Sequence, residues 1–179
     1  MTSPSSLSVQ ERAASIKLLL MDCDGVLTDG RIWILEDGED QKAFHTRDGL
    51  GLDIWHRAGL KSGIISGRHS SAVERRARAL GMDFIHLGLH DKVKAFEESL
   101  TDAGVAADYV AFIGDDLNDV PLMLRSGLAV AVGDGSADVL AHAQYVTKAK
   151  GGTGAVREVI ELILKAQNRW SDLIAEYLQ

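Results

Sequence analysis

Short apolar runs recur along the chain and alternate with stretches in which apolar residues repeat at helical spacing. The runs are continuous instead of alternating with polar residues, as is typical of strands buried on both faces of a parallel sheet. The pattern predicts strands at residues 16–21, 61–66, 83–87, 109–113 and 128–132. It predicts helices at residues 70–80, 92–103, 120–125, 137–141 and 155–178. Repeated strand–helix units of this kind indicate an α/β fold with a doubly wound, Rossmann-like parallel sheet and helices on both faces.

One segment departs from this rhythm soon after the first strand. Residues 30–36 and 41–46 are strand-like, and they flank the turn sequence Asp-Gly-Glu-Asp, so we predict a β-hairpin. The hairpin should project over the edge of the sheet at which the first strand ends. Ile32, Trp33 and Ile34 would then be exposed, and an exposed apolar patch usually marks an interface.

The chain has 179 residues, which fits one domain with an ample core. We assign residues 15–179 to this domain and expect residues 1–14 to form a flexible N-terminal tail or a loose first helix. Only 41 residues separate Asp24 from Ser66, and 22 separate Lys92 from Asp115. Once the hairpin and helices are placed, neither interval leaves room for a cap domain.

Composition narrows the classes of partner. The formal net charge of −7 argues against nucleic acid or an anionic membrane surface. No apolar run approaches the roughly 20 residues that a membrane span needs, and residues 1–15 lack the basic and apolar regions of a secretory signal. The one cysteine, Cys23, cannot form an internal disulfide, which fits a reducing compartment. We therefore expect a cytoplasmic protein that binds neither nucleic acid nor a membrane.

Two aspartate clusters, at residues 22–29 and 114–119, follow directly on predicted strands. Carboxylates at the ends of buried strands cost free energy unless their charge is offset. A hard divalent cation with oxygen ligands offsets it best, and Mg²⁺ is the natural candidate. Because ligands of such folds bind beyond the carboxyl ends of the strands, both clusters should meet at one edge of the sheet. Residues 66–68 fall at another strand end and should join them.

The Asp-x-Asp sequence formed by Asp22 and Asp24 suits phosphoryl transfer. One carboxylate can attack phosphorus to give an aspartyl-phosphate, and the other can protonate the leaving group and then activate water. A metal ion and a lysine would neutralise the charge that builds up. The alternative is a solvated turn, as most such tetrapeptides are. The preceding apolar strand and the second cluster favour catalysis.

Other candidates have a structural alternative as well. Asp115 and Asp119 can ligate or orient the metal, or they can cap the helix that follows. Ser66 precedes a helix, where its hydroxyl and nearby backbone N–H groups can hold a phosphoryl oxygen or simply cap the helix. Lys92 opens a helix, where cations are disfavoured, so it can point at an anion, although exposed lysines are common. Gly67 and Asn118 complete the candidate phosphate-binding residues.

Together these segments resemble the four motifs of the haloacid dehalogenase superfamily of phosphotransferases. Residues 22–29 resemble its first motif, residues 65–68 its second, Lys92 its third and residues 114–119 its fourth. The resemblance implies the corresponding fold and an aspartyl-phosphate mechanism.

The resemblance also implies a role for each matching residue. Asp22 would be the nucleophile and Asp24 the acid/base, while Ser66 and Lys92 would hold the phosphoryl group. Mg²⁺ would be bound by Asp22, by the backbone carbonyl of Asp24 and by Asp115. Serine replaces the threonine often found at position 66, a change that keeps the hydroxyl.

Three further segments, at residues 44–51, 73–81 and 151–158, narrow the resemblance to the family of 3-deoxy-D-manno-octulosonate 8-phosphate (KDO 8-phosphate) phosphatases. It then covers residues 16–167 and implies hydrolysis of a sugar-acid phosphate in lipopolysaccharide biosynthesis. Arg68 and Arg76 would contact the carboxylate or the sugar. The resemblance also implies a homotetramer in which the hairpins pack together and a neighbour's C-terminal segment helps to close the site.

Three other functions stay open at this point. The chain can be a phosphatase of a nine-carbon sugar-acid 9-phosphate, or a phosphomutase with the same aspartyl-phosphate. It can also be a catalytically silent oligomerising module, like those fused to sialic-acid nucleotidyltransferases. The intact residues Asp22, Asp24, Lys92 and Asp115 speak against the silent module. Release of free phosphate without an isomerised sugar phosphate would distinguish hydrolysis from mutase activity.

Overall fold

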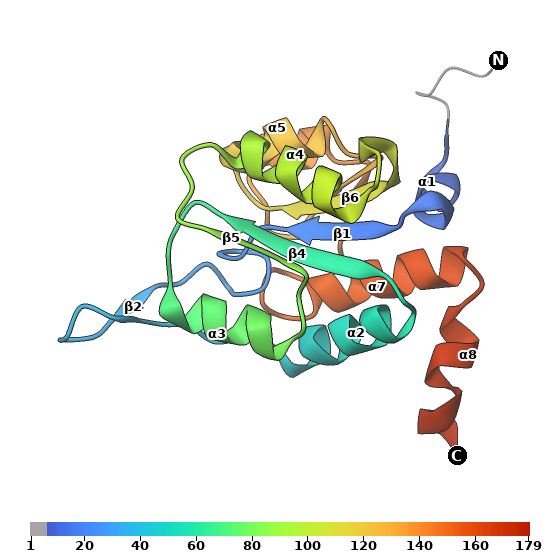
Figure 1. Ribbon diagram of the computed structural model, residues 1–179, viewed down its shortest axis with the longest axis horizontal. Helices are drawn as coiled ribbons and strands as arrows, with labels where there is room; N and C mark the ends of the chain where they lie inside the picture. The colour runs from blue at the N-terminus through green and yellow to red at the C-terminus, as the bar shows by residue number, and fades with distance from the viewer. Residues whose placement is uncertain (1–6) are drawn as a thin grey trace.

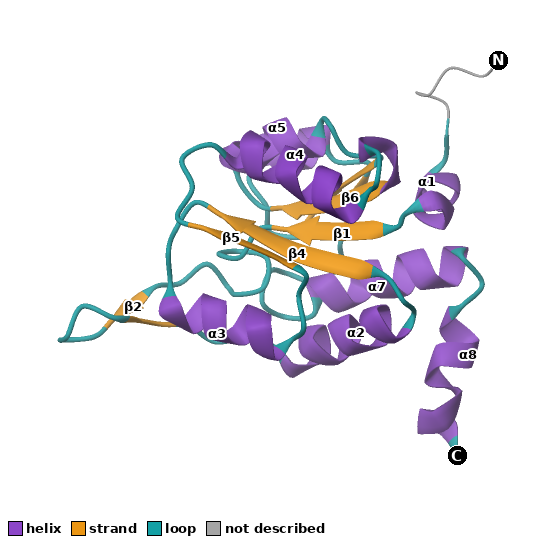
Figure 2. Cartoon of the chain, in the orientation of Figure 1, coloured by secondary structure: helices purple, strands orange, loops and turns teal. Residues whose placement is uncertain are grey.

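A parallel sheet lies at the centre of the molecule, as the computed structural model shows for residues 7–179 (Figures 1 and 2). Within these residues the sheet has six strands in the order β5-β4-β1-β6-β7-β8, and each pairing is parallel. The strands are β1 (Leu18–Met21), β4 (Lys61–Ser66), β5 (Phe84–Leu87), β6 (Val110–Gly114), β7 (Leu128–Ala131) and β8 (Tyr145–Val146). The five predicted strands are confirmed, with ends shifted by up to two residues, and β8 is an additional edge strand.

Helices cover both faces of the sheet (Figure 2). They are α1 (Val9–Ser15), α2 (Thr46–Arg57), α3 (Ser71–Ala79), α4 (Lys92–Ala103), α5 (Val120–Met123), α6 (Ala137–His142), α7 (Ala155–Ala166) and α8 (Trp170–Ile174). Short 3₁₀ turns occur at η2 (Ala107–Tyr109), η3 (Leu117–Asp119) and η4 (Ala175–Leu178). The doubly wound α/β prediction is confirmed, and no helix in the described part of the chain is long and apolar enough to cross a membrane.

Strand β1 supplies side chains to two separate cores because successive residues of a strand point to opposite faces. Leu19 and Met21 pack with α1, α2, α3 and α7 on one face. Leu18 and Leu20 pack with α4, α5 and α6 on the other. All four residues are fully buried, which explains why the run carries no polar residue.

Helix α2 is the element that the hydrophobic pattern missed. The second arm of the hairpin was predicted to continue to residue 46, but its strand covers only Asp40–Gln41, and α2 begins at Thr46. Two glycines inside α2 weaken its helical signal in the sequence. One of them, Gly51, is needed for close packing on α7, because a Cβ built there lies 3.2 Å from the Cα of Arg157.

The predicted helix at residues 155–178 is interrupted in the structure. Helix α7 ends at Ala166, and α8 begins only at Trp170. Between them Asn168 has a φ of 57°, a left-handed conformation that asparagine tolerates better than most residues. The chain turns there, and Trp170 packs beneath Arg157, whose guanidinium lies 4.9 Å from the indole ring centre.

The prediction of a flexible tail over residues 1–14 does not hold for its second half. Residues 1–6 lie outside the described part. Helix α1 follows Ser8, whose hydroxyl accepts a hydrogen bond from the backbone N–H of Glu11 while the Glu11 carboxylate accepts one from that of Ser8. Ala13 on this helix is fully buried against the core that includes α7. The alternative of a first helix is therefore confirmed for Val9–Ser15.

The hairpin projects from the body of the molecule at the end where the strands have their carboxyl termini (Figure 1). Its strands are β2 (Trp33–Ile34) and β3 (Asp40–Gln41), paired antiparallel. Trp33 and Ile34 are exposed, by 64% and 74%. No cap domain is inserted in the described chain, and the predicted hairpin is the element that projects at this edge of the sheet.

Candidate active site

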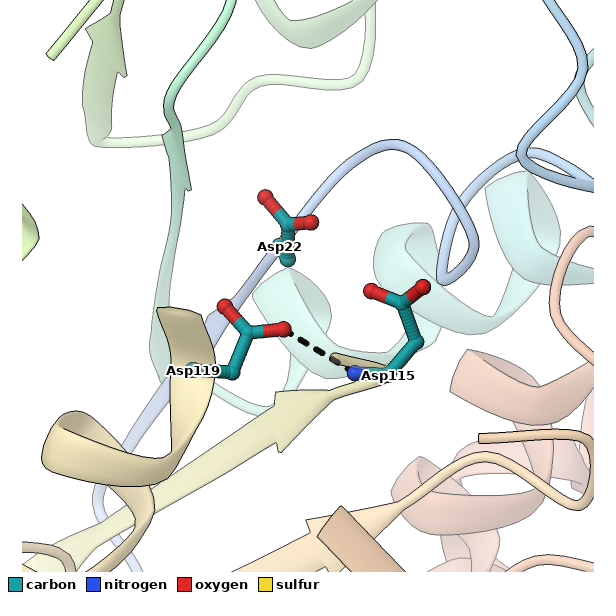
Figure 3. A group of neighbouring side chains, drawn as sticks. All are labelled: Asp22, Asp115 and Asp119. Carbon is teal, nitrogen blue, oxygen red and sulfur yellow. Dashed lines mark hydrogen bonds between the residues drawn. The ribbon is translucent and has the colours of Figure 1, made fainter. Parts of the chain in front are cut away.

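Three carboxylates from two separate clusters meet at the edge of the sheet, as Figure 3 shows. Asp22 directly follows β1, and Asp115 directly follows β6. These strands are neighbours, with Met21 paired to Ile113, so their ends place both aspartates together. Asp119 comes from the η3 turn, and one oxygen of each of the three carboxylates lies within 4.8 Å of the others. The convergence predicted from the sequence is confirmed.

Lys92 reaches into this group from the first residue of α4. Its Nζ lies 3.0 Å from Oδ1 of Asp22 and 2.8 Å from Oδ1 of Asp119. Burial favours the neutral amine, but Asp22 and Asp119 favour the ammonium, and the pKa of Lys92 is raised above its ordinary value. Lys92 is thus a buried, charged lysine that points at anions.

Asp119 organises the turn that carries Asp115. Its Oδ2 accepts hydrogen bonds from the backbone N–H groups of Asp115, at 3.0 Å, and Asp116, at 3.4 Å. With Oδ1 bound by Lys92, both of its oxygens have partners. Asp116 caps the η3 turn by accepting from the N–H of Leu117. Capping in the second cluster is therefore seen for Asp116, and Asp119 fixes the backbone that carries Asp115.

The site carries more negative charge than Lys92 can offset. Burial, followed by repulsion from Asp119, raises the pKa of Asp22 to about 6. Burial, followed by repulsion from Asp22 and Asp119, raises the pKa of Asp115 to about 8. A cation placed among these oxygens would relieve both the repulsion and the loss of hydration.

The donor set fits a hard divalent cation. The three clustered side chains offer carboxylate oxygens, and Mg²⁺ prefers oxygen ligands over nitrogen and sulfur. Oδ1 of Asp115 is buried without a hydrogen-bond partner among the described residues. Gly25 closes one side, because a Cβ built on it would lie 2.1 Å from Oδ2 of Asp115. With a φ of 95°, Gly25 also has a backbone conformation that favours glycine.

The side chain of Asp24 faces a different set of partners. Its Oδ1 accepts a hydrogen bond from Nζ of Lys42, and its Oδ2 lies 3.7 Å from Nε of Arg68. The carboxylate is therefore not part of the three-aspartate group. Two of the predicted metal ligands, Asp22 and Asp115, come together, and Asp119 joins them. For Asp24 the resemblance implied the backbone carbonyl, and not the side chain, as the ligand.

Most of the predicted phosphate-binding residues line the same region. Ser66 ends β4, is buried and accepts a hydrogen bond from the backbone N–H of Arg68. Gly67, Lys92 and Asn118 border one cavity of about 280 Å³. None of the three clustered aspartates lines this cavity or the larger groove of about 660 Å³ between α7 and β8, but Lys92, which contacts Asp22 and Asp119, borders the smaller one. The smaller cavity is therefore the better candidate for the phosphate.

Arg76 is not brought to this site. Its guanidinium lies 5.8 Å from the ring centre of Phe44. Nη2 of Arg76 would lie 2.6 Å from a Cβ built on Gly49, so the side chain lies against α2. The described contacts of Arg76 therefore assign it to packing between α3, the segment after the hairpin and α2.

Two residues of the hairpin, Asp40 and Lys42, were missed by the sequence analysis. Lys42 forms an ion pair with Asp24, and Asp40 accepts a hydrogen bond from Ser70 in the loop after β4. The signal was their i, i+2 spacing, which puts both side chains on one face of a strand. Spacing alone does not show that this face is turned toward Asp24.

Comparison with known proteins gives a consistent set of matches. The haloacid dehalogenase-like hydrolase family model matches residues 82–160. The 3-deoxy-D-manno-octulosonate 8-phosphate phosphatase of Yersinia pestis is 45% identical over 166 residues, which cover 93% of this chain and 89% of that protein.

Two solved structures of enzymes with related names carry bound ions. The 3-deoxy-D-manno-octulosonate 8-phosphate phosphatase of Moraxella catarrhalis, in complex with magnesium, phosphate and KDO, is 41% identical with a TM-score of 0.91, covering 94% of this chain and 97% of that one. The cobalt-bound deoxy-D-mannose-octulosonate 8-phosphate phosphatase of Haemophilus influenzae is 37% identical with a TM-score of 0.89, covering 94% and 99%. The similarity extends over nearly the whole chain.

Proposed function

The chain belongs to the haloacid dehalogenase-like hydrolases, in the family of 3-deoxy-D-manno-octulosonate 8-phosphate phosphatases, and we propose that it hydrolyses this sugar-acid phosphate to KDO and phosphate. The observation that carries the proposal is the meeting of Asp22, Lys92 and Asp115 at one edge of the sheet. A carboxylate, an ammonium and a cation-binding oxygen set are the groups that phosphoryl transfer to an aspartate requires.

We propose Mg²⁺ as the cofactor, held by Asp22 and Asp115, with the backbone carbonyl of Asp24 as the further ligand implied by the family. The unpartnered oxygen of Asp115 and the raised pKa values of both carboxyls support this assignment. When bound, the ion would neutralise the charge that accumulates on the phosphoryl oxygens. Lys92 holds Asp119 and Asp22 in place and supplies a second positive charge at the same point.

The proposed reaction has two steps that share one intermediate. An oxygen of Asp22 attacks phosphorus, the bond from phosphorus to the sugar oxygen breaks, and Asp24 gives its proton to that oxygen. Water then attacks phosphorus and gives a proton to Asp24, and the bond from phosphorus to the Asp22 oxygen breaks. Phosphate leaves and Asp22 is regenerated.

The residues around the cavity suit the rest of the substrate. Ser66 and Gly67 at the end of β4, with Asn118 opposite, can donate to phosphoryl oxygens beside Lys92. Arg68 lines a second hollow of about 270 Å³ between the hairpin and the start of α3. We propose that Arg68, whose side chain is 53% exposed, meets the sugar-acid carboxylate there.

Phosphate release over a panel of sugar-acid phosphates, with and without a chelator, tests the proposed function. We expect Mg²⁺-dependent release of phosphate from KDO 8-phosphate at a kcat/KM well above that for a nine-carbon sugar-acid 9-phosphate. A preference for the nine-carbon ester would change the substrate but keep the chemistry. No release from any ester, or an isomerised sugar phosphate as product, would overturn the proposal.

We also propose a cytoplasmic enzyme that works as a homotetramer assembled through the hairpin. The free thiol of Cys23 is buried and fits a reducing compartment. The hairpin presents four consecutive apolar residues to solvent (Ile32, Trp33, Ile34, Leu35). A contiguous exposed apolar patch is typical of an interface between chains.

Replacing Trp33 and Ile34 together with serine is therefore expected to shift the protein from tetramer toward smaller species. The loss of apolar area from the proposed interface is the physical reason. Sedimentation velocity at micromolar concentration measures it. Leu124→Ser is the matched control, because Leu124 is an exposed leucine on another surface. An unchanged mass for the double variant, or an equal shift in the control, would remove the hairpin from the interface.

A further inference from the structure

Lys42 is a charged residue whose side chain is completely buried next to the acid/base carboxylate. The exposed fraction of its side chain is 0%, although it lies on the hairpin arm after β3. Its Nζ donates to Oδ1 of Asp24. Nothing in the proposed chemistry uses this lysine directly. A buried ammonium is stable only where its partners are fixed, so the partners of Lys42 indicate its role.

The ammonium is fixed from the other side by the hairpin itself. Nζ of Lys42 lies 3.5 Å from Oδ2 of Asp40. Oδ1 of Asp40 accepts a hydrogen bond of 2.6 Å from the hydroxyl of Ser70. Ser70 is buried and caps helix α3 by accepting from the N–H of Val73. Lys42 is thus held between Asp24, in the loop after β1, and the start of α3.

This arrangement determines which oxygen of Asp24 is available. Oδ1 is taken by Lys42, whereas Oδ2 forms a looser ion pair with Nε of Arg68, at 3.7 Å. The Asp24 carboxylate also stays outside the group formed by Asp22, Asp115 and Asp119, so it does not act as a further side-chain ligand there. Without Lys42, the 3.7 Å ion pair with Arg68 would be the ionic contact left to the Asp24 side chain among the described residues.

We propose that Lys42 is a positioning residue that holds Asp24 with Oδ2 free to transfer the proton to the leaving oxygen. Asp40 binds Lys42, and Ser70 in turn binds Asp40, so this arm of the hairpin becomes part of the catalytic arrangement. The inference rests on the proposed function, because it concerns the proton-transfer step of the same reaction. It assigns to the hairpin a role in the chemistry of its own chain.

Two esters with different leaving groups test this inference. Departure of a sugar alkoxide from KDO 8-phosphate needs a proton, whereas the phenolate of 4-nitrophenyl phosphate leaves without one. Lys42→Met should lower kcat/KM for the sugar ester roughly 10²-fold, at the low end of what general acid catalysis contributes. For the aryl ester it should lower kcat/KM by no more than about threefold, because that step does not use the acid.

A second variant and a control guard against a folding defect. Lys42→Met leaves the carboxylates of Asp24 and Asp40 without the ammonium that lies between them. The double variant, Lys42→Met with Asp40→Asn, also removes the negative charge of Asp40, and it should show the same dependence on the leaving group. Lys94→Met is the control, because Lys94 is an exposed lysine on α4. It should leave both esters unaffected. Thermal unfolding of each variant identifies any loss of folded protein.

The outcomes separate the two proposals. If the wild-type enzyme releases phosphate from neither ester, the proposed function fails. If the wild type is active but the Lys42 variants lose activity equally on both esters, Lys42 has a structural role and the inference is overturned. Unchanged activity on the sugar ester would overturn it too. A selective loss on the sugar ester supports it.

Discussion

Replacing Asp22 with asparagine is expected to abolish phosphate release while leaving the protein folded. The amide cannot attack phosphorus, and removing a nucleophile lowers kcat by a factor on the order of 10⁴ or more. The fold should not suffer, because the ionised Asp22 is buried beside two other aspartates and its pKa is raised to about 6. A neutral side chain of the same shape removes that repulsion. We expect an unfolding midpoint no lower than that of the wild type.

Phosphate release from KDO 8-phosphate and thermal unfolding, measured on the same preparation, check both parts of this prediction. Asp102→Asn is the matched control, because Asp102 is an exposed aspartate of α4. It should retain full activity. Substantial turnover by the Asp22 variant would show that Asp22 is not the nucleophile. A large fall in its unfolding midpoint would contradict the expected stability and assign the loss of activity to unfolding.

Removal of divalent cations is expected to stop turnover and to make stability depend on pH. In the metal-free protein, the pKa of Asp22 (about 6) and that of Asp115 (about 8) both exceed the ordinary value of 3.8. The folded state then binds more protons than the unfolded state, so stability falls as pH rises. The contribution is complete below about pH 4 and is lost as pH approaches 8. Bound Mg²⁺ favours the ionised carboxylates and should flatten this profile.

Unfolding curves between pH 4 and 8, with EDTA or with excess Mg²⁺, measure the effect. At a free ion concentration of 100 times Kd, binding stabilises the folded state by about 2.7 kcal/mol. Asp115→Asn should reduce this stabilisation at neutral pH. It should also weaken the pH dependence of the metal-free protein. Equal stabilisation of the variant and the wild type by Mg²⁺ would place the ion elsewhere.

The elements that depend on strong local patterns could be predicted from the sequence. The uninterrupted apolar run before Asp22 and the one before Asp115 each form a buried strand of the sheet. Because both strands are parallel neighbours, the position of each aspartate at a strand end was enough to bring them together. Lys92 was identified for a related reason, since a lysine at the first position of a helix is unusual unless an anion is close.

Features set by long-range contacts were not predictable in the same way. Helix α2 contains Gly51 because α7 lies against it, and the sequence shows only the weakened helical pattern. Asp119 acts through backbone N–H groups of its own turn, which spacing does not reveal. The burial of Lys42 depends on Asp24, in the loop after β1, and on Asp40 of its own hairpin. The packing of Arg76 against Phe44 likewise requires the tertiary arrangement.

The shared position of strand β1 has a practical consequence for mutational surveys. Leu18 and Leu20 belong to one core, Leu19 and Met21 to the other, and the strand leads directly into Asp22. Disorder in either core would therefore change the position of Asp22, the proposed nucleophile. Phosphate release by purified variants with substitutions in either core can thus report on the packing of both cores.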